Sequence, residues 1–153
     1  MLTAYRIYAA LMTALRAVHK PVTLGVRVLV EDTKGRVLLV RHTYLRGWYL
    51  PGGGIKSRET LHQAAARELA EETGIVAREE PRLFAAYTNF HQSKSDHVLL
   101  YLLRRFEQGR WSPRFEIAEC GFFPHEKLPP DVSPATLRRL EEVRTGAPPA
   151  LHW

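Results

Sequence analysis

The chain has 153 residues, of which 45% are hydrophobic, 25% charged and 10% aromatic; these proportions exclude a disordered or fibrous protein and favour one globular domain spanning 1–153. Its single cysteine, Cys120, excludes an internal disulfide framework and any metal site built from several cysteines, and it fits a reducing, cytoplasmic compartment. A formal charge of +6 favours anionic partners such as nucleotides, RNA or phosphorylated metabolites.

The first segment predicts an amphipathic helix over residues 3–19. Its apolar positions are interrupted by Arg6, Arg16 and His19, which argues against a membrane-spanning helix and against an uninterrupted signal-peptide core. We expect this helix to pack on the domain or on a second copy of the chain. Attachment to a membrane surface and import are the alternatives.

Two strands and a helix follow in the first half of the chain. Residues 22–30 and 36–41 are rich in β-branched and apolar residues, and the turn residues between them indicate a hairpin. The segment Leu50–Gly54 contains a proline and three glycines and cannot continue a helix or a central strand. Strong helix formers predict a helix over 59–73, which Gly74 ends.

The second half of the chain predicts further strands and a last helix. Strands are expected over 83–90 and 97–106 and around 120–123. Ser133 followed by proline is typical of a helix cap and first turn, so a helix is expected over about 133–145. Strands that alternate with helices, without repeats, indicate one mixed α/β domain.

Three glutamates lie close together on the helix predicted over 59–73. At about 100° per residue, Glu68, Glu71 and Glu72 fall on one side of that helix. Like charges at this spacing repel, and Arg67 cannot neutralise all three. Carboxylate oxygens are hard ligands that suit Mg²⁺ or Mn²⁺. The alternative is an ordinary solvated face of an amphipathic helix.

The residues around these glutamates resemble the Nudix box, the defining motif of the Nudix hydrolase family. Its defining positions are filled, in order, by Gly53, Glu59, Arg67, Glu68, Leu69, Glu71, Glu72, Gly74 and Ile75. The likeness extends over roughly residues 22–130 and includes the flanking stretches Gly47–Gly52 and Glu116–Pro129. The resemblance implies a Nudix-like α/β/α sandwich with a mixed β-sheet between helices.

Nudix hydrolases cleave a nucleoside diphosphate linked to another moiety by attack of metal-activated water on phosphorus. The resemblance therefore implies a pyrophosphohydrolase that uses Mg²⁺ or Mn²⁺. The metal ligands that it implies by position are Gly53, Glu68, Glu71 and Glu72. Arg67 and Glu59 would pair across the junction between loop and helix and orient the first metal-binding glutamate, or they would form only a loop-closing ion pair.

The general base is sought outside the box, where some family members carry a glutamate before the strand that ends in an aromatic pair. Glu116 fits this position best, Glu119 is the alternative and Asp96 is a weaker third. A glutamate of the box itself is a further alternative for the general base. The implied catalytic set is therefore Arg67, Glu68, Glu71, Glu72 and Glu116.

Candidate substrate contacts flank the box. They are Arg41, Trp48, Gly52, Gly53 and Phe90, with His42, Tyr44, Arg46 and His91 as neighbours that can line the same site. Trp48 can stack on a base or belong to the core, and Phe90 can line a pocket or be a surface loop residue. Cys120 is expected to be a small core residue, because this chemistry needs no thiol.

Substrate identity is left open by the sequence. A nucleoside triphosphate, another small nucleotide and a sugar nucleotide are all compatible with the box. The rivals are an inactive nucleotide-sensing module and an enzyme acting on RNA 5′ ends, the latter suggested by the +6 charge and by Arg104, Arg105, Arg110 and Arg114. A homodimer is a further expectation, with the first helix or the tail over 147–153 covering the partner.

Overall fold

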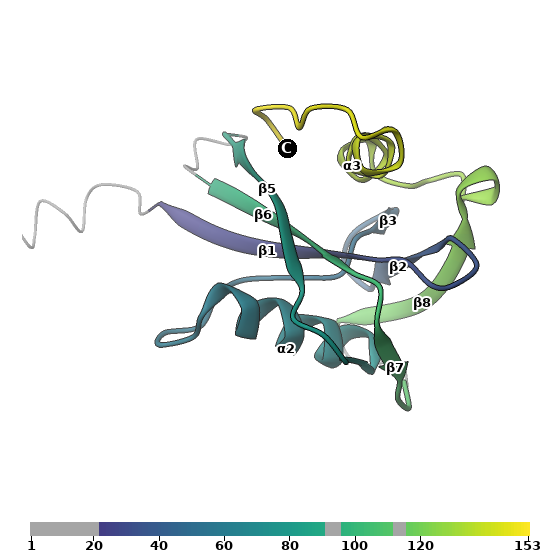
Figure 1. Cartoon of the computed structure of the whole chain (residues 1–153), viewed down its shortest axis with the longest axis horizontal. Coiled ribbons are helices and arrows are strands. Elements are labelled where there is room, and N and C mark those ends of the chain that lie inside the picture. Colours follow the sequence, from purple (N-terminus) through teal and green to yellow (C-terminus); the bar gives the residue numbers. More distant parts are fainter. Residues whose placement is uncertain (1–21, 91–95, 112–115) are drawn as a thin grey trace, which may run out of the picture.

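The structure is a computed structural model that describes residues 22–90, 96–111 and 116–153 (Figure 1). The helix predicted over 3–19 lies outside the described residues, as do His91 and Arg114. The described elements, in chain order, are β1 (Thr23–Val30), β2 (Arg36–His42), β3 (Trp48–Tyr49), α2 (Leu61–Thr73), β4 (Ile75–Ala77), β5 (Arg82–Asn89), β6 (Asp96–Leu103), β7 (Phe106–Gln108), β8 (Ile117–Pro124), the 3₁₀ turn η2 (His125–Lys127) and α3 (Pro134–Thr145).

The strands pair in parallel and antiparallel fashion. β6 lies between β1, to which it is parallel, and β5, to which it is antiparallel. β2 lies between β3 and β8, both antiparallel to it, and β4 pairs with β7. In Figure 1 the strands lie between α2 on one side and α3 on the other. The predicted α/β arrangement, with a mixed sheet between helices, is confirmed.

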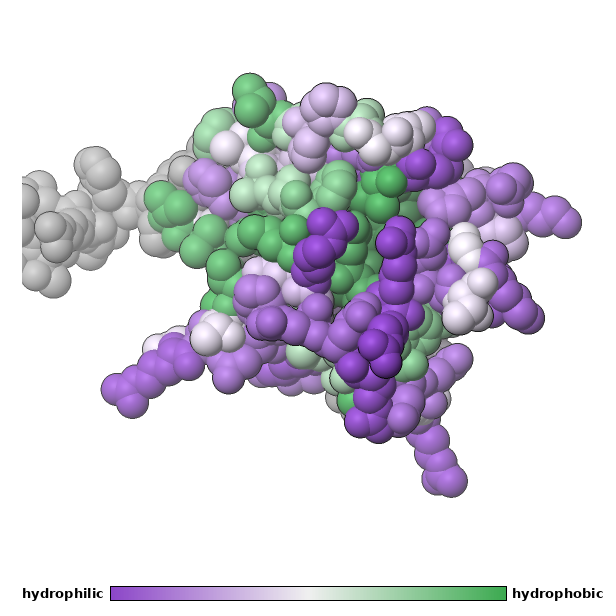
Figure 2. All heavy atoms as spheres, in the orientation of Figure 1, coloured by the Kyte–Doolittle hydropathy of each residue, from purple (hydrophilic) through white to green (hydrophobic). Residues whose placement is uncertain are grey.

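The alternation of side chains along β1 divides the core in two. Val26, Val28 and Val30 pack in one cluster with Leu69 of α2, because residues two apart on a strand point to the same face. Leu29 belongs to the other cluster, with side chains of α3. In the view of Figure 2, hydrophobic side chains gather over the strands between the two helices, with hydrophilic side chains around them.

The predicted hairpin of the first two strands is wrong in its pairing, although both strands are present. β1 and β2 meet at one isolated bridge between Glu31 and Val37. β1 instead uses its free edge to hold the glycine-containing loop, since the amides of Val26 and Val28 donate to the carbonyls of Gly53 and Pro51, both at 2.9 Å. This places the loop beside the central strand.

Helix α2 begins two residues later than predicted. Thr60 caps it through a reciprocal pair of hydrogen bonds with Gln63, at 3.2 and 2.9 Å. Gly74, at a φ of 71°, ends the helix in the left-handed conformation that favours glycine. Glu59 therefore lies in the loop before the helix, where it can turn toward a side chain on the helix surface.

Three short strands, β3, β4 and β7, were not predicted, and one predicted strand is shorter than expected. The strand expected over 97–106 ends at Leu103 in β6, and Phe106 begins β7, which pairs with β4. Between them the amides of Arg104 and Arg105 donate to one carboxylate oxygen of Glu79, at 3.1 and 3.0 Å. These hydrogen bonds satisfy the main chain where the strand breaks.

The C-terminal tail packs against its own domain. Ser133 caps α3, as predicted, by accepting from the amide of Thr136. After the helix, the tail runs beside β5, with Thr88 donating to the carbonyl of Leu151 and accepting from the amide of Trp153, both at 2.9 Å. In the part of the chain that the structure describes, no helix has the length and hydropathy needed to span a membrane.

Candidate active site

The loop between β3 and α2 approaches β1 and α2 so closely that Gly52 and Gly53 have no room for a side chain. Gly52 has a φ of 138°, and a Cβ atom there would lie 2.1 Å from the carbonyl oxygen of Val26. A Cβ atom on Gly53 would lie 2.7 Å from Oε2 of Glu68. The missing side chains thus let the loop backbone approach both the sheet and a carboxylate of α2.

Glu72 is the buried carboxylate of the site, with 7% of its surface exposed. Its Oε2 atom accepts a hydrogen bond of 2.8 Å from the amide of Gly52. Burial raises the pKa of Glu72 to about 7, although that amide and the charge of Arg27 favour the ionised form. The carboxylate of Glu72 therefore joins the loop to the last turn of α2, and the surrounding positive charge does not offset the effect of its burial.

Arg67, on α2, forms a second connection between the helix and the loop. Its guanidinium binds both carboxylate oxygens of Glu59, at 2.6 and 2.8 Å, and the carbonyl of Gly54 at 3.0 Å. It also donates to Glu68 at 2.7 Å and to Glu71 at 3.2 Å. The bonds from Arg67, together with the amide of Lys56, hold the pKa of Glu59 at about 2. The predicted pairing of Arg67 with Glu59 is present.

Glu71 is the most exposed of the three helix glutamates. About half of its side-chain surface, 47%, is open to solvent, and Lys56 approaches one of its oxygens at 3.4 Å. Glu68 is more enclosed, at 15%. The two carboxylates thus keep oxygen atoms that Arg67 does not occupy.

The residues fit a divalent metal ion by their chemistry, although the side chains are not gathered around one point. No group of three His, Cys, Asp or Glu side chains suited to an ion is found within residues 22–90, 96–111 and 116–153, because Glu68 and Glu71 are turned toward Arg67. The donor set nevertheless consists of hard carboxylate oxygens, as Mg²⁺ and Mn²⁺ prefer. Because Gly53 has no Cβ atom, its main chain can lie close to the carboxylate of Glu68. The carbonyl of Gly53 already accepts from Val26.

Among the three predicted candidates for the base, Glu116 is the one whose charge acts on a carboxylate of the cluster. Its charge raises the pKa values of Glu72 and of Tyr44, where burial has the larger effect. Glu119 lies opposite Arg41 on β2 and forms an ion pair with it. Asp96 is at the start of β6, where it accepts from Thr23 at 2.8 Å.

The predicted substrate contacts are spread over three environments. Trp48 is buried, packs edge to face on Phe123 at 4.9 Å between ring centres and belongs to the core, which is the alternative that the sequence left open. Arg41 is partly exposed and tied to Glu119. Phe90 has 57% of its surface exposed.

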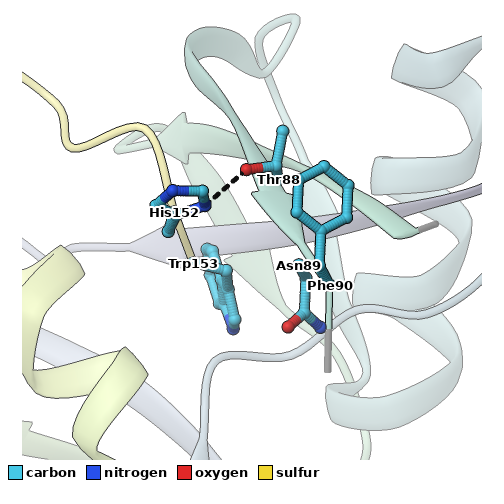
Figure 3. Close-up of a pocket in the computed structure, with 5 residues that line it drawn as sticks. All are labelled: Thr88, Asn89, Phe90, His152 and Trp153. Atoms are coloured by element: carbon cyan, nitrogen blue, oxygen red, sulfur yellow. Dashed lines mark hydrogen bonds between the residues drawn. The ribbon is translucent and has the colours of Figure 1, made fainter. Parts of the chain in front are cut away.

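Phe90 lines an open cavity of about 340 Å³ at the end of β5. Figure 3 shows its ring beside Asn89 and Thr88, with His152 and Trp153 of the tail across from them. His152 and Thr88 are joined by a 2.7 Å hydrogen bond between Nδ1 and Oγ1. The tail therefore forms part of this cavity.

A second cavity, of about 520 Å³, is formed by the loop after β2. It is lined by Arg41, His42, Thr43, Tyr44, Leu45, Arg46, Gly47 and Asp131. His42 is buried at 6% exposure, and Nδ1 of its ring has no hydrogen-bond partner in the part of the chain that the structure describes. Burial and the charge of Arg27 lower the pKa of His42, so the neutral ring is favoured.

The family model described as NUDIX domain matches residues 21–143. The chain belongs to the NUDIX family. It is 36% identical over 116 residues to MutT4 of Mycobacterium tuberculosis, covering 73% of this chain and 43% of that protein. It is 29% identical over 127 residues to the NAD-capped RNA hydrolase NudC of Vibrio cholerae, covering 81% of this chain and 46% of that protein. The chain thus spans less than half the length of these relatives.

A solved Nudix structure supports the same family. The MutT NUDIX hydrolase from Burkholderia pseudomallei aligns with a TM-score of 0.70 and 26% sequence identity, over 80% of this chain and 98% of that chain. The family identified from the box residues is therefore confirmed, together with its fold.

Two residues near the Nudix box were not predicted or were given no firm role. Arg27, in the middle of β1, donates to the carbonyls of Leu50 and Gly52 at 3.0 and 2.7 Å. The pKa of Tyr44 is raised by burial and by the charges of Glu116, Glu72 and Glu68, so its hydroxyl lies within electrostatic reach of the cluster. The available signal for Arg27 was a lone cation inside an otherwise apolar strand.

Proposed function

We propose that this chain is a divalent-metal-dependent pyrophosphohydrolase that cleaves the diphosphate of a nucleotide or of a nucleoside diphosphate derivative. The observation that carries the proposal is the network around Arg67, where one guanidinium faces the carboxylates of Glu59, Glu68 and Glu71. Buried Glu72 adds a fourth acidic group to the same loop and helix. An excess of carboxylates at one place favours a bound cation.

Glu68, Glu71, Glu72 and the main chain at Gly53 would hold the ion, Mg²⁺ or Mn²⁺. When bound, such an ion lowers the pKa of a coordinated water and offsets negative charge on phosphate oxygens. Arg67 holds Glu68 and Glu71 on the side of α2 that faces the loop, and Glu59 fixes the direction of the Arg67 guanidinium. The protein thereby supplies the orientation of the ligands.

The remaining roles belong to residues outside the helix. We assign the general base to Glu116, whose carboxylate would accept the proton of the attacking water. The water oxygen then forms a bond to phosphorus, the bridging P–O bond breaks, and its electron pair leaves with the departing phosphate. Arg41 and Phe90, at the edges of the two cavities, are the proposed contacts to the rest of the substrate.

Product identification tests this proposal. Purified protein would be incubated with Mg²⁺ or with Mn²⁺ and a panel of nucleoside triphosphates, ADP-ribose, dinucleoside polyphosphates, sugar nucleotides and capped RNA, and the products separated by chromatography. Metal-dependent release of a monophosphate from one class would support the reaction and identify the substrate. Nucleotide binding without any turnover would favour a sensing module in place of an enzyme.

An RNA 5′ end is the second candidate substrate. It is favoured by the formal charge of +6 and by the similarity to a relative named as an NAD-capped RNA hydrolase. Affinity for a polymer falls steeply with salt because bound counterions are released. Steeply salt-dependent activity that increases with RNA length would support this candidate, whereas equal activity on a mononucleotide would reject it.

A further inference from the structure

We propose that Arg27, which lies outside the Nudix box, is a positioning residue of the active site. It holds the glycine-containing loop in the conformation in which the amide of Gly52 binds the carboxylate of Glu72. The catalytic consequence rests on the proposed function above, but the positioning itself can be measured without turnover.

The carbonyl groups of the loop show why an arginine is needed. The carbonyls of Pro51 and Gly53 accept hydrogen bonds from main-chain amides of β1, both at 2.9 Å. The carbonyls of Leu50 and Gly52 accept instead from Nη1 of Arg27, at 3.0 and 2.7 Å. Four successive carbonyls are thus held by β1, two by its backbone and two by this one side chain.

The peptide groups of Gly52 connect Arg27 to the carboxylate cluster. The carbonyl of Gly52 accepts from Arg27, and the amide of the same residue donates to Glu72 at 2.8 Å. Gly52 has no freedom to move toward the sheet, where the carbonyl of Val26 lies. The position of the Glu72 carboxylate therefore depends on the guanidinium through one residue.

Charge supports the same assignment. Arg67 is engaged by Glu59, Glu68 and Glu71, whereas the amide of Gly52 and, after it, the charge of Arg27 favour the ionised form of Glu72. Arg27 is only partly buried, although Val26 and Val28 on either side of it are fully buried. The guanidinium at this strand position therefore contributes hydrogen bonds to the loop and a positive charge that favours the ionised carboxylate of Glu72.

Three variants test the proposal: Arg27→Met, Arg27→Lys and, as a matched control, Arg36→Met. Arg36 begins β2 and pairs with Asp32 in the turn between β1 and β2, so its loss removes a strand arginine whose guanidinium binds this turn and, among the described residues, makes no hydrogen bond or ion pair with the loop. Lysine keeps the charge but is a flexible point donor in place of a planar fork, so Arg27→Lys should be intermediate.

The first readout is hydrogen exchange of individual amides by NMR. In Arg27→Met the Gly52 amide should exchange about tenfold faster, relative to the Leu137 amide, than in the parent, because an anchoring hydrogen bond has been lost. The Leu137 amide of α3 donates to the carbonyl of Ser133, outside the loop and the carboxylate cluster, and serves as the internal reference. A role limited to overall stability would change both amides alike and would overturn the proposal.

The second readout is the affinity for Mn²⁺, measured by electron paramagnetic resonance of the free ion, together with kcat and KM. Arg27→Met should weaken Mn²⁺ binding and lower kcat by about tenfold with little change in KM, while Arg36→Met should match the parent in all three. Parent-like Mn²⁺ affinity and kcat in Arg27→Met would overturn the catalytic part. If the parent itself neither binds Mn²⁺ nor turns over, the proposed function fails, and the Gly52 exchange still decides whether Arg27 positions the loop.

Discussion

Two arginines, one on each helix, each tie a chain segment to the domain, but their charge balance differs. Arg67 on α2 holds the glycine-containing loop and faces three carboxylates. Arg139 on α3 is completely buried and holds the C-terminal tail. Among the residues that the structure describes, its carboxylate partner is Glu142, at 2.6 Å.

The Arg139 network is balanced in charge, because the guanidinium is paired with the carboxylate of Glu142. Its guanidinium lies 4.2 Å from the ring centre of Tyr87 and donates to the carbonyl of His152 at 2.9 Å. The second oxygen of Glu142 accepts from the hydroxyl of Tyr87 at 2.8 Å. Nε of Arg139 is buried without a hydrogen-bond partner in the described part of the chain, but both charges are paired, so removing one of them would leave the other uncompensated.

The Arg67 network, by contrast, keeps an excess of negative charge close to an exposed surface. Since a guanidinium can neutralise one of the carboxylates that surround it, the others raise the energy of the site unless a cation is present. Charge balance, more than the number of ion pairs, therefore separates the network that we propose as catalytic from the Arg139 network.

The largest expected effect is on catalysis, in Glu72→Gln and Glu71→Gln. Either change removes one ligand charge while glutamine preserves the shape, so turnover should fall by about a thousandfold with the fold intact. Metal-dependent turnover and circular dichroism would be measured side by side. Glu141→Gln, at an exposed ion pair on α3, is the control and should match the parent. Unchanged turnover in both site variants would refute the assigned roles and, with them, the contrast between the networks.

The second effect is on stability, in Arg139→Met. Removing the guanidinium leaves Glu142 charged, nearly buried and unpaired, which should cost about 3 kcal/mol and lower the Tm by roughly 10 °C. The control is Arg144→Met on the same helix, where the ion pair with Glu141 is about half exposed and is worth well under about 1 kcal/mol. Calorimetry of both variants measures the difference. Equal Tm values for the two variants would show that the Arg139 network stabilises the fold no more than an exposed ion pair does.

Much of the fold was predictable because it depends on sequence patterns among residues close together in the chain. The apolar run of β1, the capped start of α2 and the serine cap of α3 each depend on residues within a few positions of one another. Helical spacing likewise places the three glutamates on one side of α2, whereas their expected role as metal ligands and the pairing of Arg67 with Glu59 came from the resemblance to the Nudix box.

Pairing between distant segments could not be predicted in the same way. The hairpin failed because the edge of β1 binds the loop at Gly53 instead of β2, and β4 and β7 are three-residue strands too short to show a pattern. Arg27 lies 25 residues before Gly52, so nothing in the local sequence connects the two. Such contacts exist only once the sheet has formed.

The third prediction distinguishes Glu116 from Glu119 as the general base, a choice that the sequence left open. The regular register of β2 and β8 places Glu119 opposite Arg41, with which it forms an ion pair, whereas the charge of Glu116 acts on Glu72. Glu116→Gln should therefore lower kcat by about a hundredfold with nucleotide binding retained. Glu119→Gln is the matched comparison and should have a small effect. If the larger loss occurs in Glu119→Gln, the base assignment moves to that residue.

The smallest expected effect uses Cys120 on β8 to tell the two networks apart. Burial, with a contribution from the charge of Glu72, raises the pKa of the Cys120 thiol to about 11. At pH 8 about one thiol in a thousand is then ionised, so iodoacetamide should react slowly with the folded protein and rapidly in denaturant. Mass spectrometry would follow the rate.

The variants sharpen this test. Glu72→Gln removes only the minor of the two effects on the thiol and should leave alkylation slow, whereas Arg139→Met should speed alkylation in proportion to its loss of stability, because the reagent then reaches Cys120 through unfolding. Fast alkylation in Glu72→Gln with an unchanged Tm would mean that the carboxylate cluster also holds the core around β8, and the separation between a catalytic and a structural network would not stand.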